Sequence, residues 1–79
     1  MELKGKKVLV LGLARSGMAA VKLLHQYEAN ITLNESKTKE NLAEYEHLEK
    51  MNVRMVLGGQ PKELFEEDFD LVIKNPGIK

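Results

Sequence analysis

Short apolar runs alternate with amphipathic stretches along this chain, and the alternation is what most constrains its fold. Four of the runs have the length of a β-strand. They cover residues 8–11, 30–33, 53–57 and 70–74. Residues 8–11, Val-Leu-Val-Leu, are continuously apolar, which is typical of a strand buried on both faces, as in a parallel sheet. The sequence therefore predicts four strands separated by other elements.

Three helical segments are expected between these strands, over residues 18–27, 39–51 and 61–65. Ser16 precedes the first segment, where its hydroxyl is placed to cap the helix, and Pro61 suits the first position of the third. The order β-α-β-α-β-α-β predicts a parallel sheet with right-handed crossovers.

The expected fold is therefore α/β, Rossmann-like, with three α/β/α layers and about four strands in the order 2-1-3-4. Residues 1–79 form a single domain in this interpretation, because a chain of 79 residues is too short for two. The topological switch is expected between the first and third strands, and ligands of such sheets bind at the carboxyl ends of the strands near the switch.

Composition argues against several classes of function. The 12 Lys and Arg residues balance 12 Asp and Glu residues, so no overall field draws the chain to nucleic acid or to a membrane. Cysteine is absent, which removes disulfides and thiolate metal sites. The apolar run 8–11 is too short for a signal peptide or a membrane span. We expect a cytoplasmic monomer without nucleic-acid or membrane partners.

The segment after the first strand, Gly-Leu-Ala-Arg-Ser-Gly at residues 12–17, is the first candidate binding loop. Gly12 allows a tight turn, and Gly17 allows the next helix to lie close to the sheet. The free amides of that helix, together with Arg15 and Ser16, suit a phosphate or diphosphate. The alternative is a glycine turn that serves only strand–helix packing.

Two departures from known phosphate loops narrow this prediction. Ala14 replaces the middle glycine of the dinucleotide pattern G-x-G-x-x-G, which disfavours a dinucleotide. Met18 stands where a P-loop has its lysine, so no ATP site is expected here.

The segments after the other strands are weaker candidates. Glu35 lies 23 residues after Gly12, near the distance at which an acid accepts from a ribose hydroxyl, although it could equally be an exposed acid in a polar turn. Lys37 could contact a base or a phosphate, or be solvated. Gly58-Gly59 and Asn75-Pro76-Gly77 could admit a ligand closely or be ordinary turns.

Catalytic and metal-ligating patterns are not found in the sequence. It has no Ser-His-Asp arrangement, H-E-x-x-H motif or Cys-His pair. His25 and His47 are distant in sequence, and each lacks a ligand partner four residues away. We therefore expect no catalytic residue and no metal site in this chain.

Residues 4–24, with the loop Gly-Leu-Ala-Arg-Ser-Gly, and residues 70–78, with the ending Asn-Pro-Gly-Ile, resemble the opening of the UDP-N-acetylmuramoylalanine–D-glutamate ligases of the Mur ligase family. The resemblance runs over the whole chain. It implies a truncated amino-terminal domain that binds the UDP part of UDP-N-acetylmuramoyl-L-alanine in peptidoglycan synthesis. The implied substrate-binding residues are Leu13, Ala14, Arg15, Ser16, Gly17, Glu35, Ser36, Lys37, Asn75, Pro76 and Gly77.

Within that set the resemblance assigns different parts of the ligand to different segments. Arg15 and Ser16 contact the diphosphate or uridine, residues 35–37 surround the uracil, and residues 75–77 form the remaining wall. Many relatives carry Asp-Thr-Arg at residues 35–37, so Lys37 stands in place of a planar arginine.

The rest of such a ligase lies outside this chain. The resemblance implies a central domain that binds ATP and magnesium and a last domain that binds D-glutamate, so this chain itself is expected to hold no cofactor and to bind without catalysing. Two alternatives remain: a small NAD-binding or regulatory Rossmann module, and a folded fragment with no measurable affinity.

Overall fold

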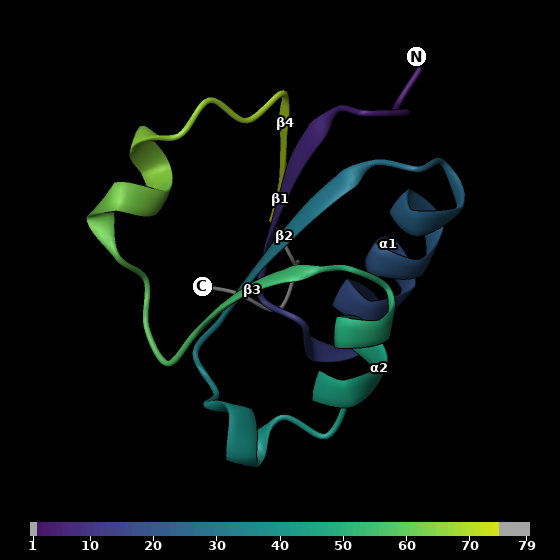
Figure 1. Ribbon diagram of the computed structural model, residues 1–79. Helices are drawn as coiled ribbons and strands as arrows, with labels where there is room; N and C mark the ends of the chain where they lie inside the picture. Colours follow the sequence, from purple (N-terminus) through teal and green to yellow (C-terminus); the bar gives the residue numbers. More distant parts are fainter. Residues whose placement is uncertain (1, 75–79) are drawn as a thin grey trace.

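The computed structural model describes residues 2–74, without the side chains of residues 14–16. Four strands form one sheet: β1 (Lys7–Leu11), β2 (Asn30–Glu35), β3 (Arg54–Leu57) and β4 (Leu71–Lys74). Two α-helices and two short 3-10 helices connect them (Figure 1). They are α1 (Ala14–Gln26), η1 (Lys39–Asn41), α2 (Tyr45–Lys50) and η2 (Lys62–Glu66).

The sheet is fully parallel, which confirms the predicted α/β class, but its strand order is β3-β2-β1-β4. The predicted order 2-1-3-4 is wrong, because β3 pairs with β2 and β4 pairs with β1. Both α1 and α2 lie on one side of the sheet (Figure 1), so two successive crossovers run in the same direction. The direction reverses only after η2, which places the topological switch between β1 and β4.

One face of the sheet carries the main hydrophobic core. Val8 and Val10 of β1 and Leu33 of β2 are fully buried there, in one cluster with apolar residues of the helices. The helical members of this cluster include Val21 and Leu48, which are also fully buried. Because side chains alternate across a strand, this face takes every second residue of β1 and β2.

The opposite face has a thinner cover. Leu9 is fully buried on that side of β1, between Val8 and Val10. Leu64 of η2 is also buried, and Figure 1 shows η2 on the side of the sheet away from α1 and α2. Val72 of β4 pairs in register with Leu9, yet its exposed fraction is 49%. The expected third layer therefore consists, in the described residues, of η2 and its flanking loops.

The first helix begins earlier than predicted. Gly12 adopts a φ of +85°, and α1 starts two residues later at Ala14, with Leu13 as its cap residue. The prediction that Ser16 caps this helix is wrong, because Ser16 is the third residue of α1 and does not precede it. The positive φ of Gly12 turns the chain so sharply that Ser16 already lies inside the first turn.

The predicted second helix, residues 39–51, is divided into η1 and α2. The apolar residues Leu42, Tyr45, Leu48 and Met51 recur strictly every third residue. On a continuous α-helix three such steps drift by about half a turn, so Leu42 and Met51 would face opposite directions. An extended residue at Leu42 breaks the helix and allows both Leu42 and Leu48 to be buried.

Truncation of the core is the first test of this arrangement. Leu48→Ala is expected to lower the free energy of unfolding by about 2–5 kcal/mol, because it leaves a cavity at a fully buried site. Leu23→Ala, at a site with an exposed fraction of 53%, is the matched control and should cost less than about 0.5 kcal/mol. Urea unfolding followed by circular dichroism measures both, and equal losses would contradict the described core.

A second test uses two neighbouring glycines. Gly58 has a φ of +80° with only ordinary contact to the Thr38 methyl at 3.7 Å, whereas Gly59 has open space around it. Gly58→Ala should therefore cost about 1–2 kcal/mol through backbone strain alone. Gly59→Ala should change stability by less than about 1 kcal/mol in either direction. A reversed ranking in urea unfolding would contradict the backbone conformation described for this turn.

Candidate functional site

Polar side chains are buried at the carboxyl end of β2. Of the residues whose exposure the structure describes, the buried polar ones all lie on this strand: Thr32, Asn34 and Glu35. Asn34 and Glu35 end the strand, and the pleat directs their side chains to opposite faces of the sheet. The loops after β1, β2 and β3 begin at this same edge. Glu35, predicted within a loop, is thus the last residue of a strand.

The carboxylate of Glu35 joins the segment after β1 to the segment after β2. Its Oε1 accepts a hydrogen bond from the amide of Leu13 at 3.0 Å. Its Oε2 accepts from the amide of Lys37 at 2.8 Å and from the hydroxyl of Ser36 at 3.2 Å. With an exposed fraction of 8%, Glu35 is not the exposed acid that the alternative interpretation described.

These donors keep the buried carboxylate charged. Burial by itself raises the pKa of Glu35. The hydrogen bonds from the amides of Lys37 and Leu13 and from the Ser36 hydroxyl, together with the Lys37 charge, lower the pKa by more than burial raises it. The net pKa lies below the ordinary value of 4.5, so Glu35 is ionised at neutral pH. A negative charge is therefore fixed at the amino terminus of α1, where the helix dipole stabilises it.

Asn34 plays the corresponding part for the segment after β3. Its Nδ2 donates to the carbonyls of Val56 at 3.0 Å and Gly59 at 2.6 Å. Its Oδ1 accepts from Nε2 of Gln60 at 3.2 Å. The loop that follows β3 is thus attached to β2 through one buried amide.

Backbone hydrogen bonds connect the same segments directly. The amide of Gly12 donates to the Asn34 carbonyl at 2.7 Å, and the amide of Gly58 donates to the carbonyls of Glu35 at 3.0 Å and Lys37 at 3.2 Å. Residues 12–13, 36–37 and 58–60, which we call the carboxyl-edge loops, are therefore held together as one unit.

Apart from Glu35, the predicted substrate-binding residues fall into four groups. Ser36 and Lys37 are exposed beside Glu35, where a ligand can reach them. Leu13 and Gly17 are buried, and Leu13 belongs to the hydrophobic core. The backbone of residues 14–16 forms the first turn of α1. Residues 75–77 lie outside the described part of the chain.

Two residues of the carboxyl edge were missed by the sequence analysis as site residues. Asn34 follows buried residues of the same strand, and a polar residue at the end of a buried strand indicates that its side chain has a specific hydrogen-bonding partner. Gln60 follows two glycines in an exposed turn and carries no such signal, since only the folded chain brings it to Asn34.

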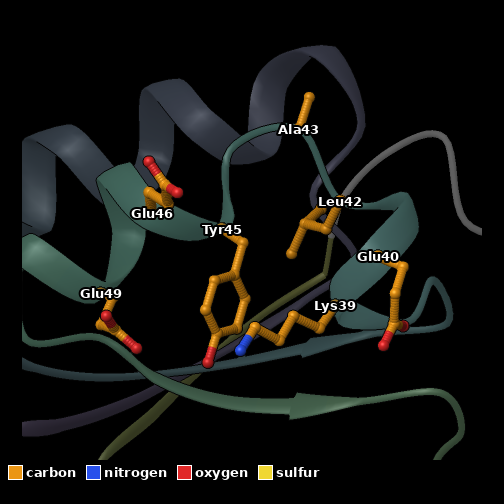
Figure 2. A pocket seen from close by; sticks show the side chains of 7 residues that line it. All are labelled: Lys39, Glu40, Leu42, Ala43, Tyr45, Glu46 and Glu49. Carbon is orange, nitrogen blue, oxygen red and sulfur yellow. The ribbon is translucent and has the colours of Figure 1, made fainter.

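Two surface hollows lie away from this edge. One, of about 420 Å³, lies between η1 and α2 (Figure 2). It is lined by Lys39, Glu40, Leu42, Ala43, Tyr45, Glu46 and Glu49. The second, of about 300 Å³, lies near the amino ends of β1 and β4. Neither hollow includes a predicted substrate-binding residue.

The larger hollow is polar in character. Figure 2 shows the side chains of Lys39 and Tyr45 directed toward one another, and the Lys39 ammonium lies 5.0 Å from the centre of the Tyr45 ring. The carboxylates of Glu46 and Glu49 come from α2. Mixed charges on an exposed helix are typical of a solvated surface.

Residues 2–74 contain neither a metal-binding cluster nor a membrane-spanning helix. No three His, Cys, Asp or Glu side chains gather there in a way that could hold a metal ion. In the same part of the chain, no helix has both the length and the apolar character needed to cross a membrane.

Comparison with solved structures supports the fold. The crystal structure of the PH0520 protein from Pyrococcus horikoshii is similar to the whole chain, with a TM-score of 0.71 and 22% sequence identity, and the chain covers 21% of that protein. At this identity the likeness concerns the fold alone.

Comparison of sequences is more specific. The chain is 53% identical over 73 residues to the UDP-N-acetylmuramoylalanine–D-glutamate ligase of a Geobacillus strain, and 48% identical over 75 residues to that of Enterococcus faecalis. These matches include 92% and 95% of this chain. The chain spans only 16% of the length of either relative.

The family described as "Mur ligase MurD-like, N-terminal domain" matches residues 6–79, which is nearly the whole chain. The matched range includes all four strands and the three carboxyl-edge loops. On this evidence the chain belongs to the family of MurD-like Mur ligase N-terminal domains.

Proposed function

We propose that this chain binds the UDP part of UDP-N-acetylmuramoyl-L-alanine, as the amino-terminal domain of an ATP-dependent ligase that adds D-glutamate during peptidoglycan synthesis. The relatives that carry this name are about half identical to the chain. The observation that carries the proposal is the Glu35 contact, which joins the start of α1 to Ser36 and Lys37 although 22 residues separate Leu13 from Glu35.

The diphosphate is assigned to the start of α1. The first amides of any α-helix lack acceptors within the helix, and the helix dipole favours an anion there. Glu35 already accepts a hydrogen bond from the amide of Leu13, so the ligand would use amides further into the first turn, at residues 15–17. Arg15 would add a positive charge that offsets the nearby carboxylate.

The uridine is assigned to the segment after β2. Ser36 and Lys37 are exposed next to the first turn of α1, and their backbone is fixed by Glu35 and by the amide of Gly58. A base or ribose beside the diphosphate would meet these two side chains. Residues 75–77, predicted as the remaining wall, would complete the pocket.

In the reaction that the resemblance implies, the substrate carboxylate is activated as an acyl phosphate, which the D-glutamate amine attacks. ATP, magnesium and D-glutamate would bind to the rest of the longer protein, so this chain alone would bind without catalysing. Binding of the remote UDP end would supply energy and positioning for chemistry elsewhere. We place this protein in the cytoplasm, as a monomer.

One observation favours a second candidate, a small NAD-binding or regulatory module. The strand order β3-β2-β1-β4 is that of dinucleotide-binding sheets, and these also place an acid after the second strand. Against it, Ala14 occupies the middle glycine position at which the pyrophosphate approaches the backbone.

A titration of the ¹⁵N-labelled chain distinguishes the two candidates. UDP is expected to shift the amide resonances of residues 15–17, 36–37, 75 and 77, because these residues surround the proposed pocket. NAD serves as the control and should leave them in place. Shifts with NAD alone would replace the proposal by the dinucleotide module, and no shifts with either ligand would show that this chain does not bind UDP.

A matched pair of lysines tests the uridine assignment. Lys37→Ala is expected to weaken UDP binding about tenfold, which corresponds to loss of about 1.4 kcal/mol from a charged contact. Lys39→Ala, two residues away beside Tyr45, should leave the dissociation constant unchanged. Calorimetric or NMR titration measures both, and equal effects of the two changes would contradict the assignment of Lys37.

A further inference from the structure

Glu35 is already occupied by donors of its own chain. Three hydrogen bonds reach its two oxygens, from the amides of Leu13 and Lys37 and from the hydroxyl of Ser36, over 2.8–3.2 Å. An ionised carboxylate has about four acceptor positions, so most of its capacity is used before any ligand arrives. Its exposed fraction of 8% also leaves little room for a ribose hydroxyl.

We infer that Glu35 is a positioning residue, whose carboxylate holds the first turn of α1 at the distance from Ser36 and Lys37 that UDP requires, and does not itself bind the ribose. This inference rests on the proposed function, because it concerns the same pocket. It replaces both sequence-based assignments of Glu35, as a ribose acceptor and as a residue that contacts the uracil, with a role that acts through Leu13 and Lys37.

The two oxygens of Glu35 serve two different segments. Oε1 faces the amide of Leu13 and Oε2 faces the amide of Lys37, so the carboxylate bridges them. Both partners are donors, and a carboxylate is the side-chain group that can accept on both sides. A glutamine of the same size would direct an NH₂ group toward one of these two amides, and that hydrogen bond would be replaced by a repulsive contact.

The remaining supports of this loop are backbone contacts and the core. Gly12 donates to the Asn34 carbonyl, and the Leu13 side chain is buried with an exposed fraction of 3%. These contacts fix where the chain leaves β1. The Glu35 contact attaches Leu13 to residues 36–37. Without it, these two segments would be connected only through their common neighbour β2. The distance between the proposed diphosphate and uridine subsites therefore depends on this carboxylate.

The test compares Glu35→Gln with the unaltered chain, using UDP, its 2′,3′-dideoxy analogue and its N3-methyl analogue, which lacks the N–H donor of the uracil. Glu35→Gln is expected to raise the dissociation constants of all three ligands by the same factor, about tenfold, and to shift the amide resonances of Leu13 and Lys37 before ligand is added. Glu35→Asp, which keeps the charge, should bind UDP more tightly than Glu35→Gln. Leu48→Ala is the control for stability, and below its unfolding temperature it should bind UDP normally.

Four outcomes would overturn the inference. Unchanged UDP binding by Glu35→Gln would do so. A loss seen with UDP but absent with either analogue would also do so, since that pattern requires direct contact with the ribose or the uracil. If Glu35→Gln does not fold, Glu35→Asp decides: weaker binding of all three ligands by one factor supports the inference, and binding equal to the unaltered chain overturns it. Absence of UDP binding to the unaltered chain would overturn the proposed function and the inference together.

Discussion

The carboxyl edge of this sheet depends on the buried carboxylate of Glu35. An ionised group removed from water is strongly destabilising unless its lone pairs are satisfied, and here two backbone amides and a hydroxyl satisfy them. Asn34 repeats the arrangement on the other face with a neutral amide. No buried side-chain nitrogen or oxygen in the described residues lacks a hydrogen-bond partner. Two adjacent residues thus connect loops on both faces of the sheet, because a strand directs neighbouring side chains in opposite directions.

The elements of this fold could be predicted from its sequence, but the order of its strands could not. The apolar run 8–11 marks a buried strand because a parallel sheet excludes water from both faces. The same alternation of strands and helices is compatible with β3 beside either β1 or β2. What decides between them is the side of the sheet on which each connection crosses, and both α1 and α2 bury their apolar residues against one face. That choice is made by tertiary packing, which no local pattern records.

The candidate site was predictable in part for a similar reason. Glu35 could be identified by its distance from Gly12, and Lys37 by its place next to Glu35. The partners of Glu35 could not be predicted, because its side chain reaches Leu13 only after α1 has been placed on the sheet. Gln60 shows the same limit more clearly, since its contact with Asn34 joins residues that differ by 26 positions in the sequence.

The uneven cover of the two sheet faces bears on how the chain fluctuates. The face under α1 and α2 is held by the main core, whereas the other face is covered, within residues 2–74, by the short helix η2, and Val72 on that face is half exposed. Protein regions with few buried apolar contacts open at lower free energy than the core, so η2 should exchange its amide hydrogens long before β1 and β2. Such an opening strains the Asn34–Gly59 hydrogen bond but leaves the Glu35 contacts untouched. Local opening on the η2 side of the sheet therefore leaves the geometry at the start of α1 unchanged.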